Sequence, residues 1–247
     1  MIRLTRPLPP AEFTDEFRQN GTEDFKKTRK AVWKQPFIYE GLKQMSNSKC
    51  AFCECRLQEE SKYLEIEHFA HKDGYPDKVL EWDNFLPACR RCNGQKSTHD
   101  VLAEPIINPA DEDPREHLRF RLYRFEGLTT KGCTTESVLS LNDYQRLMLN
   151  RFRVGEAVLQ QLDELADKLS RFSPSAGSVR HQNRILSQLI NLMNEGQPTE
   201  EYSATVATAI VHSERYAFVA QELRKHRLWS DELAALDEGI RSIAYPP

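Results

Sequence analysis

Two pairs of cysteines constrain this chain more than any other feature of its sequence. The pairs are Cys50-Ala-Phe-Cys53 and Cys89-Arg-Arg-Cys92, and 35 residues separate Cys53 from Cys89. Each pair can place two thiolates on one metal ion through a tight turn, and two such pairs complete the tetrahedral sulfur shell that Zn²⁺ prefers. A four-cysteine shell leaves no open coordination position. The spacing therefore predicts a structural zinc ion that takes no part in chemistry.

The alternative use of six cysteines, a disulfide framework, requires an oxidising compartment. The opening segment, MIRLTRPLPP, has two arginines and three prolines and lacks the apolar core of a signal peptide. No stretch approaches the ~18 consecutive apolar residues of a membrane span. We therefore expect a cytoplasmic protein with no membrane segment. The two remaining cysteines, Cys55 and Cys133, are expected to be ordinary free thiols.

The interval between the cysteine pairs carries the other distinctive residues. Residues 63–69 alternate between apolar and polar and predict a strand that ends with Glu67 and His68. Asn84 opens a short second strand, and the second cysteine pair leads into a helix expected to begin at Asn93. The predicted order is strand, loop, strand and helix.

This order and these residues resemble the HNH endonuclease motif, the ββα-metal or His-Me finger fold, in its form with two CxxC zinc knuckles. The segments that carry the resemblance are IEHF and DNFLPACRRCNGQK. The third motif position is Asn93, which makes the chain an H-N-N variant. The expected fold class is mainly α, with a small ββα-metal zinc-knuckle module and a helical carboxy-terminal region.

The resemblance implies a role for each motif residue in phosphodiester hydrolysis. His68, with an ordinary pKa of roughly 6.5, would take the proton of the attacking water. Glu67 and Asn93 would supply oxygen ligands to one Mg²⁺ or similar divalent ion. Asn84 would orient His68 by holding its loop. Taken singly, these residues have plainer interpretations: a core histidine, an ion-paired glutamate and a turn asparagine.

Three basic residues near the predicted helix are expected to contact nucleic-acid phosphate: Arg90, Arg91 and Lys96. His71 is either a second imidazole at the metal or a loop residue facing solvent, and the loop interpretation is favoured. His99 is expected to be incidental to the site.

The sequence divides into four expected parts. Residues 1–49 form a Pro-rich arm and a basic helical segment, in which Pro36 interrupts a helical pattern running from Thr22 to Met45. Residues 50–104 form the zinc-stabilised module, and residues 105–141 form a linker with short strands, including one strand over 118–127. Residues 142–247 form a helical bundle and a possible docking region for a partner. Its apolar face steps through residues 158, 162, 165, 169 and 172, with helix breaks expected near 173–175, 196–198 and 230–231.

A wider resemblance extends over roughly residues 1–125. The segments RPLPP, CAFCE and PIINPADEDPREHL, together with the motif, resemble the PtuB-type HNH proteins of Septu and retron-associated anti-phage systems. The resemblance implies a toxic nuclease effector that works with an ABC-type ATPase of the PtuA kind. Some members also associate with a reverse transcriptase and its RNA–DNA product. The chain has no GxxxxGK[ST] pattern, so ATPase activity would come from another polypeptide.

The charge of the chain leaves other functions open. The net charge of −3 excludes a uniformly basic protein that coats nucleic acid, although residues 26–49 carry seven basic residues and one acid. One competing hypothesis is a non-catalytic zinc module that binds nucleic acid or protein. Another is a restriction-like HNH nuclease that works alone. Neither the motif nor the charge distinguishes DNA from RNA as the substrate.

Overall fold

The computed structural model describes residues 1–57, 63–171 and 179–247. These residues form two compact units, which are described separately. The first comprises Met1–Leu118 and Phe125–Asn142, and the second comprises Arg119–Arg124 and Asp143–Pro247.

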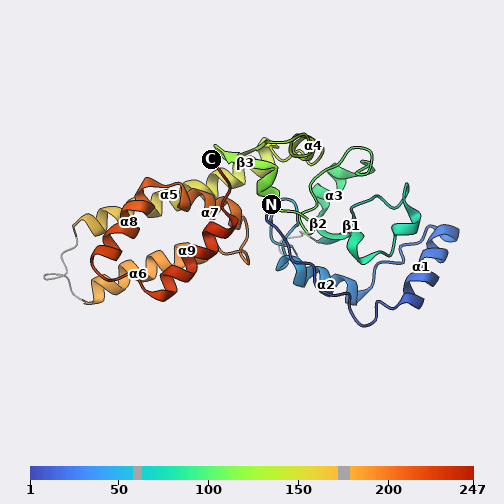
Figure 1. Cartoon of the computed structure of the whole chain (residues 1–247), viewed down its shortest axis with the longest axis horizontal. Coiled ribbons are helices and arrows are strands. Elements are labelled where there is room, and N and C mark those ends of the chain that lie inside the picture. The colour runs from blue at the N-terminus through green and yellow to red at the C-terminus, as the bar shows by residue number, and fades with distance from the viewer. Residues whose placement is uncertain (58–62, 172–178) are drawn as a thin grey trace. The chain divides into compact units, whose positions relative to one another are not determined.

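The first unit is organised around an antiparallel pair of short strands, β1 (Leu64–His68) and β2 (Phe85–Cys89) (Figure 1). The register sets Leu64 opposite Cys89 at one end of the pair and His68 opposite Phe85 at the other. Helix α3 (Arg90–Lys96) follows β2 directly. The expected order of strand, loop, strand and helix is therefore present.

The start of α3 differs from the sequence prediction. The helix begins at Arg90 and not at Asn93, because Cys89 adopts an extended conformation and its Sγ accepts a hydrogen bond from the backbone N–H of Cys92. A side-chain acceptor at this position satisfies a backbone N–H that the first helical turn leaves without a partner. Asn93 consequently lies in the middle of the helix.

Two helices precede the strands, where the sequence suggested one interrupted helical segment. Helix α1 (Asp15–Thr28) ends at Arg29, whose φ of 59° is in the left-handed region. Helix α2 (Pro36–Ser46) begins at Pro36, a residue that the first helical turn accepts because no N–H is required there. Helix α2 buries its apolar face, Ile38, Leu42 and Met45, and packs against both strands.

The loop between the strands contains two short 3₁₀ turns, η1 (Pro76–Lys78) and η2 (Trp82–Asn84). The Pro-rich arm packs against it. Arg6 Nη1 donates to the carbonyls of Trp82 and Phe85 at 2.9 and 2.8 Å, and Trp82 Nε1 donates to the carbonyl of Pro7 at 2.9 Å. The arm is therefore part of the framework that holds the β1–β2 loop.

The segment expected to form one strand over 118–127 instead forms a hairpin of β3 (Leu118–Arg121) and β4 (Arg124–Gly127). Leu122 and Tyr123 both have positive φ, 48° and 64°, which is the geometry of a two-residue hairpin turn. The turn η3 (Pro114–Glu116) precedes this hairpin, and α4 (Thr130–Val138) follows it.

The second unit is helical. A π-helical turn, η4 (Tyr144–Met148), leads into α5 (Leu149–Ser170), and α6 (Val179–Asn194), α7 (Ser203–Val211), α8 (Glu214–Lys225) and α9 (Asp231–Ile243) follow. The predicted apolar face of α5 is buried at residues 158, 162, 165 and 169. Helix α7 is buried along almost its whole length and packs against α5, α8 and α9.

The predicted helix break at 196–198 falls between α6 and α7, and the one at 230–231 coincides with the start of α9, which Ser230 caps. Phe172 and the predicted break at 173–175 lie outside the described residues. A further break at 212–213 was not predicted. There Ser213 caps α8 by accepting a hydrogen bond from the N–H of Tyr216.

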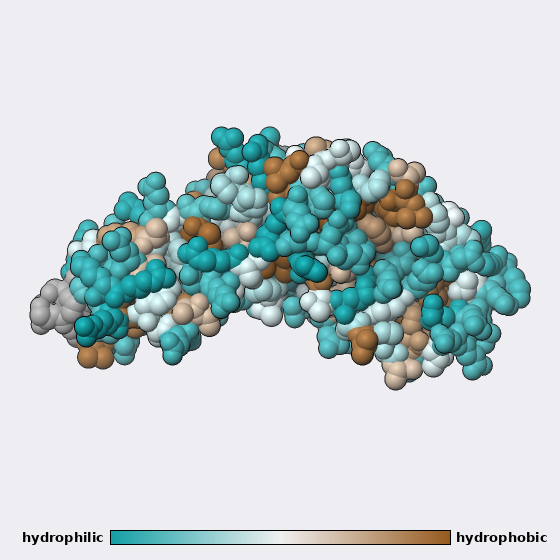
Figure 2. Space-filling view, viewed as in Figure 1, coloured by the Kyte–Doolittle hydropathy of each residue, from teal (hydrophilic) through white to brown (hydrophobic). Residues whose placement is uncertain are grey.

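In the described part of the chain, no helix combines the length and the apolar character that a membrane crossing requires. The face of the molecule in Figure 2 is mostly hydrophilic, and its hydrophobic residues lie in small separate groups.

Candidate functional site

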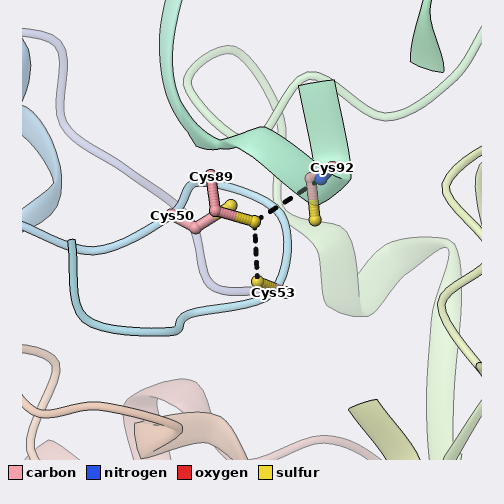
Figure 3. A group of neighbouring side chains, drawn as sticks. All are labelled: Cys50, Cys53, Cys89 and Cys92. Atoms are coloured by element: carbon pink, nitrogen blue, oxygen red, sulfur yellow. Dashed lines mark hydrogen bonds between the residues drawn. The ribbon is translucent and has the colours of Figure 1, made fainter. Parts of the chain in front are cut away.

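Four sulfur atoms meet at one end of the β1–β2 pair. The Sγ atoms of Cys50, Cys53, Cys89 and Cys92 all lie within 4.8 Å of one another, and all four residues are buried (Figure 3). The Sγ atoms of Cys53 and Cys89 are 3.8 Å apart. Zn–S bonds of ~2.3 Å in a tetrahedron separate the sulfurs by roughly 3.8 Å, whereas a disulfide would bring them to about 2.05 Å. The cluster therefore fits a tetrahedral metal ion such as zinc.

Backbone contacts bring the two cysteine pairs together. The N–H of Ala51 donates to the carbonyl of Pro87 at 2.8 Å, which docks the first pair on β2. Cys89 ends β2 and caps α3, so the second pair is fixed by the junction of the strand and the helix. The thiols of the cluster affect one another's pKa values: hydrogen bonds with neighbouring cysteines lower the pKa of Cys89 and raise the pKa values of Cys53 and Cys92.

The other two cysteines differ in their surroundings. Cys55 is buried beside the cluster, but it is not one of the four mutually close sulfurs. Cys133 is exposed, and its thiol faces the carbonyl of Gly127 at 3.7 Å.

His68 lies at the opposite end of the strand pair, in an aromatic cage. Its ring packs edge-on against Trp33 and Phe85, with centroid distances of 4.6 and 5.2 Å, and the residue is 5% exposed. Burial lowers the pKa of His68 to about 4, so the ring is neutral at pH 7. Its Nε2 lies 3.1 Å from the carbonyl oxygen of Val79. Because a carbonyl only accepts, Nε2 carries the proton and Nδ1 carries the free lone pair.

Asn84 fixes the loop that supplies this carbonyl. Its Nδ2 donates to the carbonyls of Ala70 and Lys78, both at 3.0 Å, and its Oδ1 accepts from the N–H of Ala70 at 2.7 Å. Ala70 lies two residues after His68, and Lys78 directly precedes Val79. One buried amide therefore holds both sides of the loop around His68, which is what an orienting role for Asn84 requires.

Glu67 is held by a buried ion pair that the sequence analysis did not predict. Its Oε1 lies 2.7 Å from Lys96 Nζ, which also donates to the carbonyl of His68 at 3.1 Å. Glu67 is 2% exposed and Lys96 is 1% exposed. Burial raises the pKa of Glu67 to about 7 despite the opposing effect of the ammonium. The expectation that Lys96 contacts phosphate is corrected, because its charge is directed into the interior.

Asn93 pairs with a residue that sequence reasoning missed. Its Nδ2 donates to Glu65 Oε2 at 2.7 Å, so the amide oxygen of Asn93 is its free end. Glu65 and Glu67 are two residues apart in β1, and residues at this spacing share one face of a strand. The alternation that predicted the strand was therefore a signal that Glu65 belongs to the same face as Glu67.

The two arginines before Asn93 have different surroundings. Arg91 donates to the carbonyls of Leu139 and Ser140 at 3.1 and 2.7 Å, so it secures the chain after α4 and does not present its charge to a ligand. The expectation for Arg91 is corrected on this ground. Arg90 is exposed.

A pocket of about 360 Å³ collects most of these side chains. Glu65, Glu67, His68 and Asn93 line it from β1 and α3. Its other lining residues include Trp33, Lys34, His71 and Lys72.

Three other residues considered in the sequence have different positions. Asn84 does not line the pocket and affects it only by holding the β1–β2 loop. His99 lies apart from the lining and bonds to the carbonyl of Glu104 at 2.8 Å. His71 is half-buried, and its Nδ1 accepts from the N–H of Gly74 at 3.1 Å.

Comparison with known proteins identifies two relatives. The chain is 40% identical over 240 residues to the Septu protein PtuB of Bacillus thuringiensis, and the match covers 94% of this chain and 90% of that protein. It is 27% identical over 222 residues to the Septu protein PtuB of Bacillus mycoides (strain KBAB4), a match that covers 71% of this chain and 74% of that protein. No family model matches the sequence.

The sulfur cluster predicts that one ligand substitution removes both metal and structure. We expect Cys89→Ser to lose bound zinc and to unfold the β1–β2–α3 region, because metal binding at such a site contributes folding free energy directly. Zinc per chain by elemental analysis and the thermal unfolding midpoint measure this. Cys133→Ser, which changes an exposed thiol, should keep both values. Full zinc content in Cys89→Ser would contradict the assignment.

The buried Glu67–Lys96 pair predicts a pH-dependent loss of stability. We expect Lys96→Met to lower the free energy of unfolding by about 3 kcal/mol at pH 8, because it leaves a buried carboxylate without its partner. Without the ammonium, the folded-state pKa of Glu67 rises further above 7, while the ordinary value is 4.5. The folded variant therefore retains a proton above pH 7, and its stability falls further as the pH rises.

Urea unfolding of Lys96→Met and of the unsubstituted chain at pH 6, 7 and 8 measures the difference. The zinc site is common to both proteins, so its own pH dependence cancels. Lys30→Met, at an exposed lysine, is the control. A deficit that stays constant over these pH values would show that Glu67 does not titrate as described.

Proposed function

The chain belongs to the PtuB family of Septu proteins, and we propose that it is the metal-dependent HNH endonuclease effector of an anti-phage defence system. One observation carries the proposal. His68 is held neutral, with its Nδ1 lone pair free, at the edge of a pocket that also contains Glu65, Glu67 and Asn93. Hydrolysis of a phosphodiester uses a general base together with oxygen ligands that hold a divalent cation.

In the proposed reaction, Nδ1 of His68 accepts the proton of the attacking water. Hydrogen bonding of Nε2 to Val79 fixes the tautomer and the ring orientation. The low pKa keeps the base form fully populated at pH 7. A phosphate entering the pocket brings negative charge, which favours the protonated ring and strengthens the base where it is needed. Asn84 supports this by holding the loop on both sides of Val79.

The acidic side of the pocket fits a hard divalent cation such as Mg²⁺. Glu67 and the amide oxygen of Asn93 are the residues that would hold it, since both offer oxygen ligands. When bound, the ion supplies Lewis acidity to the phosphate and to the leaving oxygen. Glu65 orients Asn93 by accepting from its Nδ2, which leaves the amide oxygen available.

The remaining parts of the chain have supporting roles in this proposal. Zinc at the four cysteines holds the structure of the strand pair and of α3. A PtuA-like ABC-type ATPase is the proposed partner, and the helical unit from residue 143 onward, whose described residues do not line the pocket, is its proposed docking region. Both relatives carry Septu names, which favours this ATPase over a retron reverse transcriptase as the partner.

A non-catalytic zinc module that binds nucleic acid or protein is the competing function. The observation that favours it is the Glu67–Lys96 pair, which engages one of the proposed metal ligands with a buried internal cation. A restriction-like nuclease that works alone is distinguished from the leading proposal by co-purification. A stable complex with an ATPase supports the Septu effector, and cleavage by the isolated chain supports the independent nuclease.

The nuclease proposal predicts that His68→Gln abolishes cleavage and preserves the fold. Glutamine can still donate to the Val79 carbonyl, but it cannot take a proton from water. We expect the cleavage rate of DNA or RNA in Mg²⁺ to fall at least about a hundredfold, the usual contribution of a general base. The assay uses the chain alone and in complex with its ATPase partner.

His99→Gln serves as the matched control, because His99 is a half-buried histidine outside the pocket. It should cleave at the rate of the unsubstituted chain. Equal cleavage by His68→Gln and the unsubstituted chain would refute the catalytic role of His68. Zinc content and the unfolding midpoint are measured in parallel to show that each variant is folded.

A further inference from the structure

We propose that Lys34 and Lys72 form a subsite for a backbone phosphate of the nucleic acid, at the rim of the pocket that contains His68. This inference rests on the proposed nuclease function and specifies how its substrate is held. It assigns phosphate contacts to the α1–α2 connection and the β1–β2 loop, in place of Arg91 and Lys96 of α3, which the sequence suggested.

Two segments that are distant in sequence supply these lysines. Lys34 lies in the connection between α1 and α2, and Lys72 lies four residues after the end of β1. Both line the same pocket as Glu67 and His68. The rim therefore combines two cations with the proposed base and the proposed metal ligands.

Trp33 connects the two lysines to the base. Its ring packs edge-on against His68, and the Lys72 ammonium lies over that ring, 5.7 Å from its centroid. Lys34 is the next residue in the chain. The charge of Lys72 opposes the rise in the pKa of Glu67 and adds to the lowering of the pKa of His68, as its place in the same pocket implies. A phosphate that contacts Lys72 is therefore brought to the pocket where the reaction is proposed to occur.

These two lysines also lack the carboxylate partners that other lysines of the first unit have. Within the described residues of that unit, carboxylates pair with Lys26, Lys27, Lys43, Lys78, Lys96 and Lys131. Lys34 and Lys72 form no ion pair with any described residue. An unpaired ammonium at a pocket rim loses no internal interaction when it binds an external anion.

The charges inside the pocket favour an anion at its rim. The buried Lys96 ammonium compensates Glu67, and the Asn93 amide satisfies one oxygen of Glu65. His68 is neutral. Because Lys96 neutralises Glu67, the charges that remain at the pocket are those of Lys34, Lys72 and Glu65. The two lysines outweigh the one carboxylate, so the remaining charge is positive. A phosphodiester, which carries one negative charge per phosphate, matches that excess.

Lys30 provides a matched control for the proposal. It belongs to the same α1–α2 connection, is exposed and, like Lys34, has no ion pair within the described residues. It does not line the pocket. A general effect of positive charge would therefore appear at Lys30 as well, whereas a subsite would not.

The test measures binding of fluorescein-labelled single-stranded DNA, duplex DNA and single-stranded RNA by anisotropy, across a series of salt concentrations. The full chain carries His68→Gln so that no cleavage occurs, and it is assayed both alone and with its ATPase partner. We expect Lys34→Gln and Lys72→Gln each to weaken binding several-fold. Each should also reduce the slope of log K against log salt by about 0.7 to 0.9, the value for one lost phosphate contact.

Lys30→Gln should change neither quantity, and Lys34→Arg and Lys72→Arg should retain both. If the lysines contact the backbone, the variants should lose the same affinity for every polymer that binds. Which of the three polymers binds identifies the substrate class. An unchanged slope in the Lys34→Gln, Lys72→Gln double variant would overturn the subsite. So would an equal effect of Lys30→Gln, or the absence of binding to all three polymers at low salt.

Cleavage by chains that retain His68 separates this inference from the proposed function. We expect the two lysine variants to raise KM more than they lower kcat, because they remove binding and not the base. If His68→Gln still cleaves, the proposed function fails whatever the lysines do. If His68→Gln is inactive and the double lysine variant keeps the KM of the unsubstituted chain, the subsite alone is refuted.

Discussion

The position of a single sulfur atom, that of Cys89, determines much of the first unit. This residue ends β2, caps α3 and brings its Sγ into the cluster with the turn that carries Cys50 and Cys53. Two strands of five residues are marginally stable on their own, and a slip of one residue in their register would move every side chain to the opposite face. A metal ion held by the four sulfurs would link the first cysteine pair to the strand–helix junction and prevent that slip. The register in turn determines the face of the strand on which each of Glu65, Glu67 and His68 lies.

The opposite end of the strand pair is held by polar contacts within loops. Asn84 binds the backbone at Ala70 and Lys78, and Arg6 binds the carbonyls of Trp82 and Phe85 on either side of it. These contacts allow an irregular loop to be as well positioned as a strand. They also place the Phe85 ring against His68, and His68 is 5% exposed. The contacts that hold the loop therefore help to bury His68, and burial lowers its pKa.

Much of this framework could be predicted from the sequence, because its signals are local. The cysteine spacing predicted the sulfur cluster, and alternation predicted β1. What failed was the direction of long side chains. Lys96 lies one helical turn after Asn93, and nothing in that spacing shows that its ammonium turns inward to Glu67. Arg91 likewise found carbonyl partners 48 and 49 residues away. Such pairings depend on which elements meet in space, and the local pattern does not encode that.

The strands of the pair are five residues long, so the cysteine cluster and His68 are separate sites at the two ends of one element. Chelators such as EDTA would act on both ends at once: they would withdraw the ion proposed for the pocket, and they would compete for an ion held by the sulfurs. Inhibition by a chelator is therefore ambiguous evidence about the reaction, because a collapsed scaffold and an empty pocket give the same inactive sample. Restoration by Mg²⁺ alone, in protein whose zinc content has been shown to be intact, is the observation that attributes the activity to the pocket.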